Sequence, residues 1–137
     1  MAQGFATNGN IVITGTVDTG NSTIATLLAA ATFTGVGVDV SAYPSVSSTV
    51  FTDQAGTLYM ELSTNNINWD NSVSIPVLAN TQIDYTVVVT SKYFRVRFYN
   101  SSGSNQTVLR LQTLFGSAEP QITKITGAED SGSYPDP

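Results

Sequence analysis

The stretch STNNINWD contains the side chains whose types and spacing best suit ligand binding, among them Trp69, the only tryptophan of the chain. Trp69 could stack on a sugar ring while neighbouring oxygens bind its hydroxyls, those of Asn65, Asn66, Asn68 and Asp70. The competing interpretation is a tight turn at Asn65 and Asn66, because asparagine tolerates a positive φ, with Trp69 as a lid over the core. We favour this structural interpretation, since tryptophan is buried more often than it binds sugars.

The same stretch spaces oxygen donors in a way that could suggest a calcium loop, at Asn66, Asn68 and Asp70. It has no glycine for the sharp turn of an EF-hand and no glutamate to close the coordination. We therefore predict no metal site and no cofactor.

A second candidate is the segment KYFRVRFYN, whose alternate residues share a face if the segment is a strand. One face then carries Tyr93, Arg95, Arg97 and Tyr99. Tyrosine and arginine are enriched where proteins meet, so these four residues are the predicted interface with a partner. Stacking on nucleic acid is disfavoured, because the net charge is −5 and the chain has only five basic residues.

Catalytic chemistry finds little support in the composition. The chain has no cysteine and no histidine, which excludes the usual Ser-His-Asp and Cys-His triads. The acidic residues are scattered among expected turns and exposed strand positions, so no carboxylate pair is placed for hydrolysis. We therefore expect a protein that is not an enzyme.

The elements that would position these side chains are short strands. A length of 137 residues suits one domain, and most segments alternate apolar and polar residues with a period of two. We predict an all-β fold, an antiparallel β-sandwich of jelly-roll-like type. The predicted core residues are Val46, Val50, Leu58, Met60, Leu62, Phe94, Val96, Phe98, Leu109 and Leu111.

Three local signals refine this prediction. Pro76 inside VSIPVL indicates an edge or bulged strand, because proline cannot donate a ladder hydrogen bond. Gly103 in NSSGSN predicts a hairpin between the strands on either side. The segment NSTIATLLAAATF contains good helix formers after Ser22, but its threonines and phenylalanine argue against a long helix. A short helix there is the minor alternative.

The two ends differ in composition from the middle. We predict an N-terminal arm over 1–20, the sandwich over 21–116 and a C-terminal tail over 117–137. Both ends carry apolar runs that could pair with the sheet edge of a neighbouring subunit, through Ile11, Val12, Ile13, Ile122 and Ile125. No stretch is long and apolar enough to predict a membrane span.

The middle of the chain resembles a β-sandwich module of tailed-phage virion proteins, over roughly residues 30–116. The resemblance is carried by ATFTGVGVDVSAYPSVSSTVFTDQAGTLYMELSTNNINWD and by KYFRVRFYNSSGSNQTVLRLQTLF. This sequence departs from the family pattern at Asn65 and Asn66, where an acidic residue and glycine are more usual. The resemblance implies that these residues form a hairpin turn, with Trp69 as a structural lid.

The resemblance also implies a function, that of a virion structural protein. We expect a capsid decoration or cement protein of a tailed phage, a homotrimer docked on the major capsid protein or another virion protein. The first alternative is a receptor-binding or adaptor module of a tail or fibre, for which no heptad stalk is visible. The second is a carbohydrate-binding module that uses Trp69 with Tyr59 or Tyr99, and we favour it least.

Overall fold

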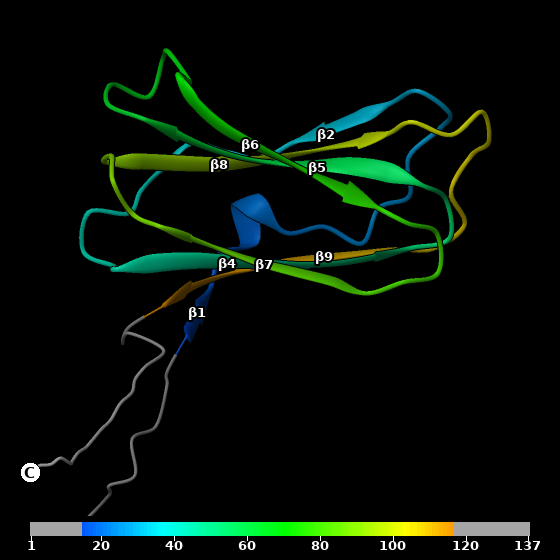
Figure 1. Cartoon of the computed structure of the whole chain (residues 1–137), viewed down its shortest axis with the longest axis horizontal. Helices are drawn as coiled ribbons and strands as arrows, with labels where there is room; N and C mark the ends of the chain where they lie inside the picture. The colour runs from blue at the N-terminus through cyan, green and yellow to red at the C-terminus, as the bar shows by residue number, and fades with distance from the viewer. Residues whose placement is uncertain (1–14, 117–137) are drawn as a thin grey trace, which may run out of the picture.

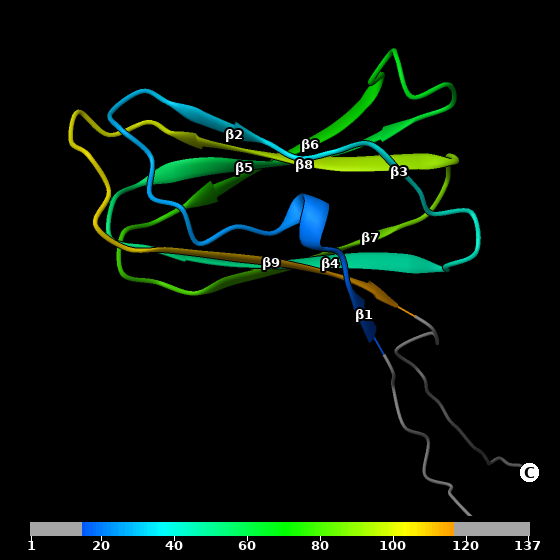
Figure 2. The same cartoon turned by 180° about the vertical axis from the view of Figure 1, so that it is seen from behind.

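Two antiparallel sheets pack face to face in the computed structural model, which describes residues 15–116 (Figures 1 and 2). The four-stranded sheet has the order β1-β9-β4-β7, and the five-stranded sheet has the order β2-β8-β5-β6, with β3 also paired to β8. A 3-10 turn, η1, spans Thr19–Asn21. The strands are β1 (Gly15–Val17), β2 (Thr32–Thr34), β3 (Val38–Asp39), β4 (Ser45–Thr52), β5 (Gly56–Ser63), β6 (Asn71–Val77), β7 (Ile83–Val88), β8 (Tyr93–Asn100) and β9 (Leu109–Gly116).

The two antiparallel sheets confirm the predicted all-β sandwich, and the chain crosses between them several times. Among the described strands, β5 and β6 are the one consecutive pair that hydrogen-bonds directly. The predicted hairpin around Gly103 is wrong, because β8 and β9 lie in different sheets. The chain crosses there since the buried Asn100 side chain donates hydrogen bonds to the carbonyls of Leu27, Leu28 and Ser104 and so ties the crossing to the loop before β2.

The core confirms the period-two analysis. All the predicted core residues are buried, and β8 alternates strictly between half-buried and buried positions. Phe94, Val96 and Phe98 have no exposed surface. The core also contains Val40, Ile75, Val77 and Phe115.

The segment after η1 forms no helix in the described structure, as the sequence favoured. Asn21 is fully buried and anchors the beginning of this segment between the two sheets. Its Nδ2 donates to the carbonyl of Val36 at 2.9 Å, and its Oδ1 accepts from the backbone N–H of Val96 at 2.8 Å. Further along, Thr23 bridges to Leu111 of β9. The backbone of Thr23 exchanges hydrogen bonds with Leu111, and the N–H of Leu27 donates to the Gln106 side chain, so these backbone groups are satisfied without a helix.

The predicted boundary of the N-terminal arm needs correction. Residues 15–17 pair with β9, and η1 follows directly, so residues 15–20 belong to the sandwich. At the other side of the fold, Pro76 lies in β6, an edge strand, as predicted. Within residues 15–116 no helix is long and apolar enough to cross a membrane.

A candidate interaction surface on the five-stranded sheet

The outer face of the five-stranded sheet carries the four residues predicted as an interface. Tyr93, Arg95, Arg97 and Tyr99 all point away from the core and are half-buried. The antiparallel register places Glu61 opposite Arg95 and Tyr59 opposite Arg97. Glu61 was not among the predicted site residues, although alternation in TLYMELS places it on the outward face. Its role depends on the pairing of β5 with β8.

Glu61 joins the two arginines into one ion-paired cluster. Its side chain accepts hydrogen bonds from Nε of Arg95 at 2.8 Å and from Nη2 of Arg97 at 2.8 Å. Nε of Arg97 donates a further hydrogen bond at 3.1 Å, and Ser72 of β6 donates another at 3.0 Å. Burial disfavours the charged carboxylate, since Glu61 is only 3% exposed, but hydrogen bonds from Arg97, Arg95 and Ser72 outweigh it and lower the pKa of Glu61. Arg95 and Arg97 therefore do not form a basic patch of unpaired charges.

Aromatic rings cover the same arginines. The guanidinium of Arg95 lies 4.5 Å from the ring centroid of Trp69, and that of Arg97 lies 4.3 Å from Tyr59. Cation–π contacts of this kind add to the ion pairs and hold the long side chains flat against the sheet. Lys92 contacts Tyr93 at 5.5 Å and pairs with Asp39 at 3.8 Å, with both side chains about half exposed. The face is consequently flat and partly apolar, and the single carboxylate of Glu61 offsets one of the two arginine charges.

The turn expected at Asn65 and Asn66 is present. Asn66 has a φ of 61°, and the Asn65 side chain accepts from the backbone N–H groups of Ile67 and Asn68. The hydroxyl of Ser63 accepts from the backbone N–H groups of Asn65 and Asn66. The asparagines thus satisfy the backbone of their own turn, which is the structural interpretation of STNNINWD.

Trp69 lies elsewhere than predicted. It is half-buried and does not belong to the hydrophobic core, so it is no lid over the end of the sandwich. It packs on the outer layer, against Arg95 and beside Gly37. A Cβ at Gly37 would lie 3.0 Å from the Trp69 ring and would collide with the Asn66 side chain. The inward positions of β5 and β6 are already filled by aliphatic side chains, and the flat guanidinium of Arg95 offers the ring its contact.

The remaining predicted site residues do not join this surface. The arm residues Ile11, Val12, Ile13, Ile122 and Ile125 lie outside the described residues. Within residues 15–116, no three acidic side chains gather in a way that could hold a metal ion.

The fold defines the chain as an antiparallel β-sandwich domain. It matches the family model described as "Uncharacterised protein YqxG N-terminal domain" over residues 6–116, so the chain belongs to this family. The family domain therefore includes most of the predicted N-terminal arm. No curated protein matches the chain.

Two solved structures are similar. The "PBSX exported protein XepA" has a TM-score of 0.66 and 26% identity, and the match covers 79% of this chain and 38% of that chain. This chain thus corresponds to well under half of the XepA chain. A carbohydrate binding module from Cellvibrio mixtus lichenase 5A, solved with cellotriose, has a TM-score of only 0.34 and 16% identity, over 66% of this chain and 86% of that one.

Proposed function

We propose that this chain is a non-enzymatic structural protein of a phage, and more specifically a decoration or cement protein of the capsid surface. The observation that carries the phage assignment is the likeness to XepA of phage PBSX, at 26% identity over 79% of the chain. The virion location rests on the motifs of the tailed-phage modules. The absence of histidine and cysteine from the whole sequence supports a role without catalysis.

The outer face of the five-stranded sheet is the surface that we propose to contact the virion. Its arginines are already paired with Glu61, so a partner would not have to strip water from unpaired charges. Its rings and guanidinium groups, those of Tyr93, Arg95, Arg97 and Tyr99, are of the kinds enriched at protein interfaces. The partner is the major capsid protein or another virion protein.

Assembly of the protein with itself, as a homotrimer, is the second part of the proposal. The edge strand β6 carries Pro76, which discourages pairing, whereas β7 has neither proline nor lysine and leaves Tyr85 and Val88 exposed. An apolar arm of a neighbouring subunit, with Ile11, Val12 and Ile13, could add a strand to β7. Such a head-to-tail contact closes into a ring when its rotation suits.

The experiment has two steps. Mass spectrometry of purified particles and immunogold labelling ask whether the protein is present and whether it lies on the head. Pelleting with bare capsids then compares the wild type with Tyr93→Ala/Tyr99→Ala and with Gln112→Ala, a control on the exposed face of β9 in the other sheet. We expect the double variant to lose pelleting and the control to keep it.

Other outcomes contradict the proposal. Absence from particles would refute the virion assignment, and labelling of the tail would favour the adaptor alternative. Light scattering tests the oligomer, and a strict monomer would refute the trimer. A carbohydrate-binding role for Trp69 has less support, since the ring is half-buried and Arg95 stacks on it.

A further inference from the structure

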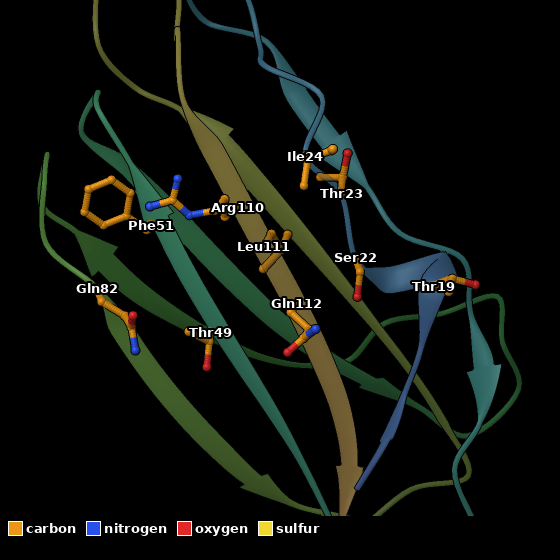
Figure 3. A pocket seen from close by; sticks show the side chains of 10 residues that line it. All are labelled: Thr19, Ser22, Thr23, Ile24, Thr49, Phe51, Gln82, Arg110, Leu111 and Gln112. Atoms are coloured by element: carbon orange, nitrogen blue, oxygen red, sulfur yellow. The ribbon is translucent and has the colours of Figure 1, made fainter.

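A groove of about 520 Å³ lies on the outer face of the other, four-stranded sheet (Figure 3). Its floor is formed by β9 and β4, and the segment that follows η1 forms one wall. This volume falls within the usual range for small-ligand sites. No residue of the groove belongs to the proposed virion contact, so the two surfaces can be tested separately.

Arg110 is the charged group of the groove. It is opposite Phe51 in the register of β9 with β4, and its guanidinium lies 4.7 Å from the centroid of that ring. Among the described residues no side chain or carbonyl accepts a hydrogen bond from it, and no carboxylate lies within ion-pair distance. The planar guanidinium of Arg110 is therefore held in place by the ring, and its N–H groups are available to donate two hydrogen bonds to a carboxylate.

The rest of the lining offers neutral polar groups beside apolar ones. Gln112 lies two residues further along β9 on the same exposed face, and Thr19 of η1 lines the far end of the groove (Figure 3). Neither side chain is hydrogen-bonded to another described residue. Ile24, which is 80% exposed, and Phe51 provide apolar surface next to them. Apolar surface beside unpaired hydroxyl and amide groups is the combination that packs against a sugar ring while binding its hydroxyls.

Two features restrict the ligand further. Asp84 is hydrogen-bonded to Gln82 and Thr49 at one side of the groove, so negative charge is disfavoured there. The ligand should then carry its carboxylate at the Arg110 end and be neutral elsewhere. In the floor, Leu111 of β9 is paired with Val50 of β4 on one side and with Thr23 on the other, so a peptide could not add a strand at this position.

We propose that this groove binds an acidic oligosaccharide with a single terminal carboxylate. Arg110 binds the carboxylate, Phe51 and Ile24 pack against the sugar rings, and Gln112 binds hydroxyl groups. This inference goes beyond the proposed structural role and does not depend on it.

Calorimetry with the full chain tests the proposal. The probes are sialyllactose, which carries one carboxylate, the neutral trisaccharide galactosyllactose and the fully acidic trigalacturonic acid. We expect sialyllactose to bind best. Arg110→Gln should weaken its binding about tenfold or more, because a charged hydrogen bond is lost. Gln112→Ala should weaken it about threefold. The matched control Lys92→Gln removes the same charge from the other sheet and should change nothing.

Several results would overturn the proposal. Equal binding of the neutral trisaccharide, or an unchanged affinity in Arg110→Gln, would remove the role of the carboxylate. Equal losses of sialyllactose affinity in Arg110→Gln and Lys92→Gln would mean that only the net charge of the protein matters. No binding of any of the three sugars would exclude the site, and tighter binding of an acidic peptide would make it a protein contact. Melting temperatures of all variants establish that each is folded.

Discussion

The two outer faces of the sandwich use arginine in opposite ways. On the five-stranded sheet, Arg95 and Arg97 share Glu61 and stack on Trp69 and Tyr59. On the four-stranded sheet, Arg110 also stacks on a ring, but no described carboxylate pairs with it. This difference in ion pairing comes from the residue that lies opposite each arginine on the neighbouring strand.

Similar residue patterns in β8 and β9 thus lead to two different outer surfaces. Outward arginine beside inward aliphatic residues describes both RVRF in β8 and LRLQ in β9. The partner strand presents a glutamate in the first case and Thr49 and Phe51 in the second. On the first face both arginines are held by Glu61, which suits packing, whereas Arg110 on the second face keeps its charge available for a ligand.

The largest expected effect lies in the core that both faces share. Phe98→Ala should lower the free energy of unfolding by about 3–5 kcal/mol, because it removes a fully buried ring and leaves a cavity. Urea unfolding of the variant beside Tyr99→Ala, its half-buried neighbour, measures the difference. An unchanged midpoint for Phe98→Ala would mean that the inward and outward faces of β8 are reversed.

Removing the Glu61 carboxylate is the most direct test of the difference between the two faces. Glu61→Gln keeps the shape but leaves Arg95 and Arg97 without their carboxylate, so stability should fall by about 2–3 kcal/mol, less than for a fully buried pair because both arginines are partly exposed. Asp84→Asn on the four-stranded sheet is the matched control and should change stability by less than about 0.5 kcal/mol. Equal effects of the two substitutions would abolish the contrast.

The stability that Glu61 contributes to the five-stranded face should also depend on pH. The pKa of Glu61 is lower in the folded chain than its ordinary value of 4.5, so its contribution is complete above the unfolded pKa and is lost as pH falls through the folded one. The stability difference between wild type and Glu61→Gln should therefore shrink as the pH is lowered below about 4.5. Chemical unfolding of both proteins at a series of pH values measures it. A difference that grows in acid would contradict the ion-paired cluster.

The smallest expected effect is that of Trp69. Trp69→Ala should cost about 1 kcal/mol, the range of a partly exposed cation–π contact, because Trp69 lies outside the core. Thermal melting provides the value, and capsid pelleting should be retained. A stable variant that lost binding to a glycan would instead make Trp69 a ligand-binding residue.

Much of the fold was readable from residue order. Strand positions, the inward faces, the turn at Asn66 and the edge position of Pro76 follow from local periodicity and backbone preference. The hairpin at Gly103 was not readable, because a polar glycine turn has the same composition whether it joins paired strands or crosses between sheets. The buried role of Asn21 was hidden for a similar reason, since asparagine usually marks a surface turn.

The candidate sites divide along the same line. The sequence by itself determined that Tyr93, Arg95, Arg97 and Tyr99 share one face, because side chains alternate along any strand. The strand pairing in three dimensions places Glu61 against both arginines, Trp69 against Arg95 and Arg110 beside a groove. These outcomes depend on which strands become neighbours and in which register. Pairing of that kind joins residues far apart in the chain, so no local pattern specifies it.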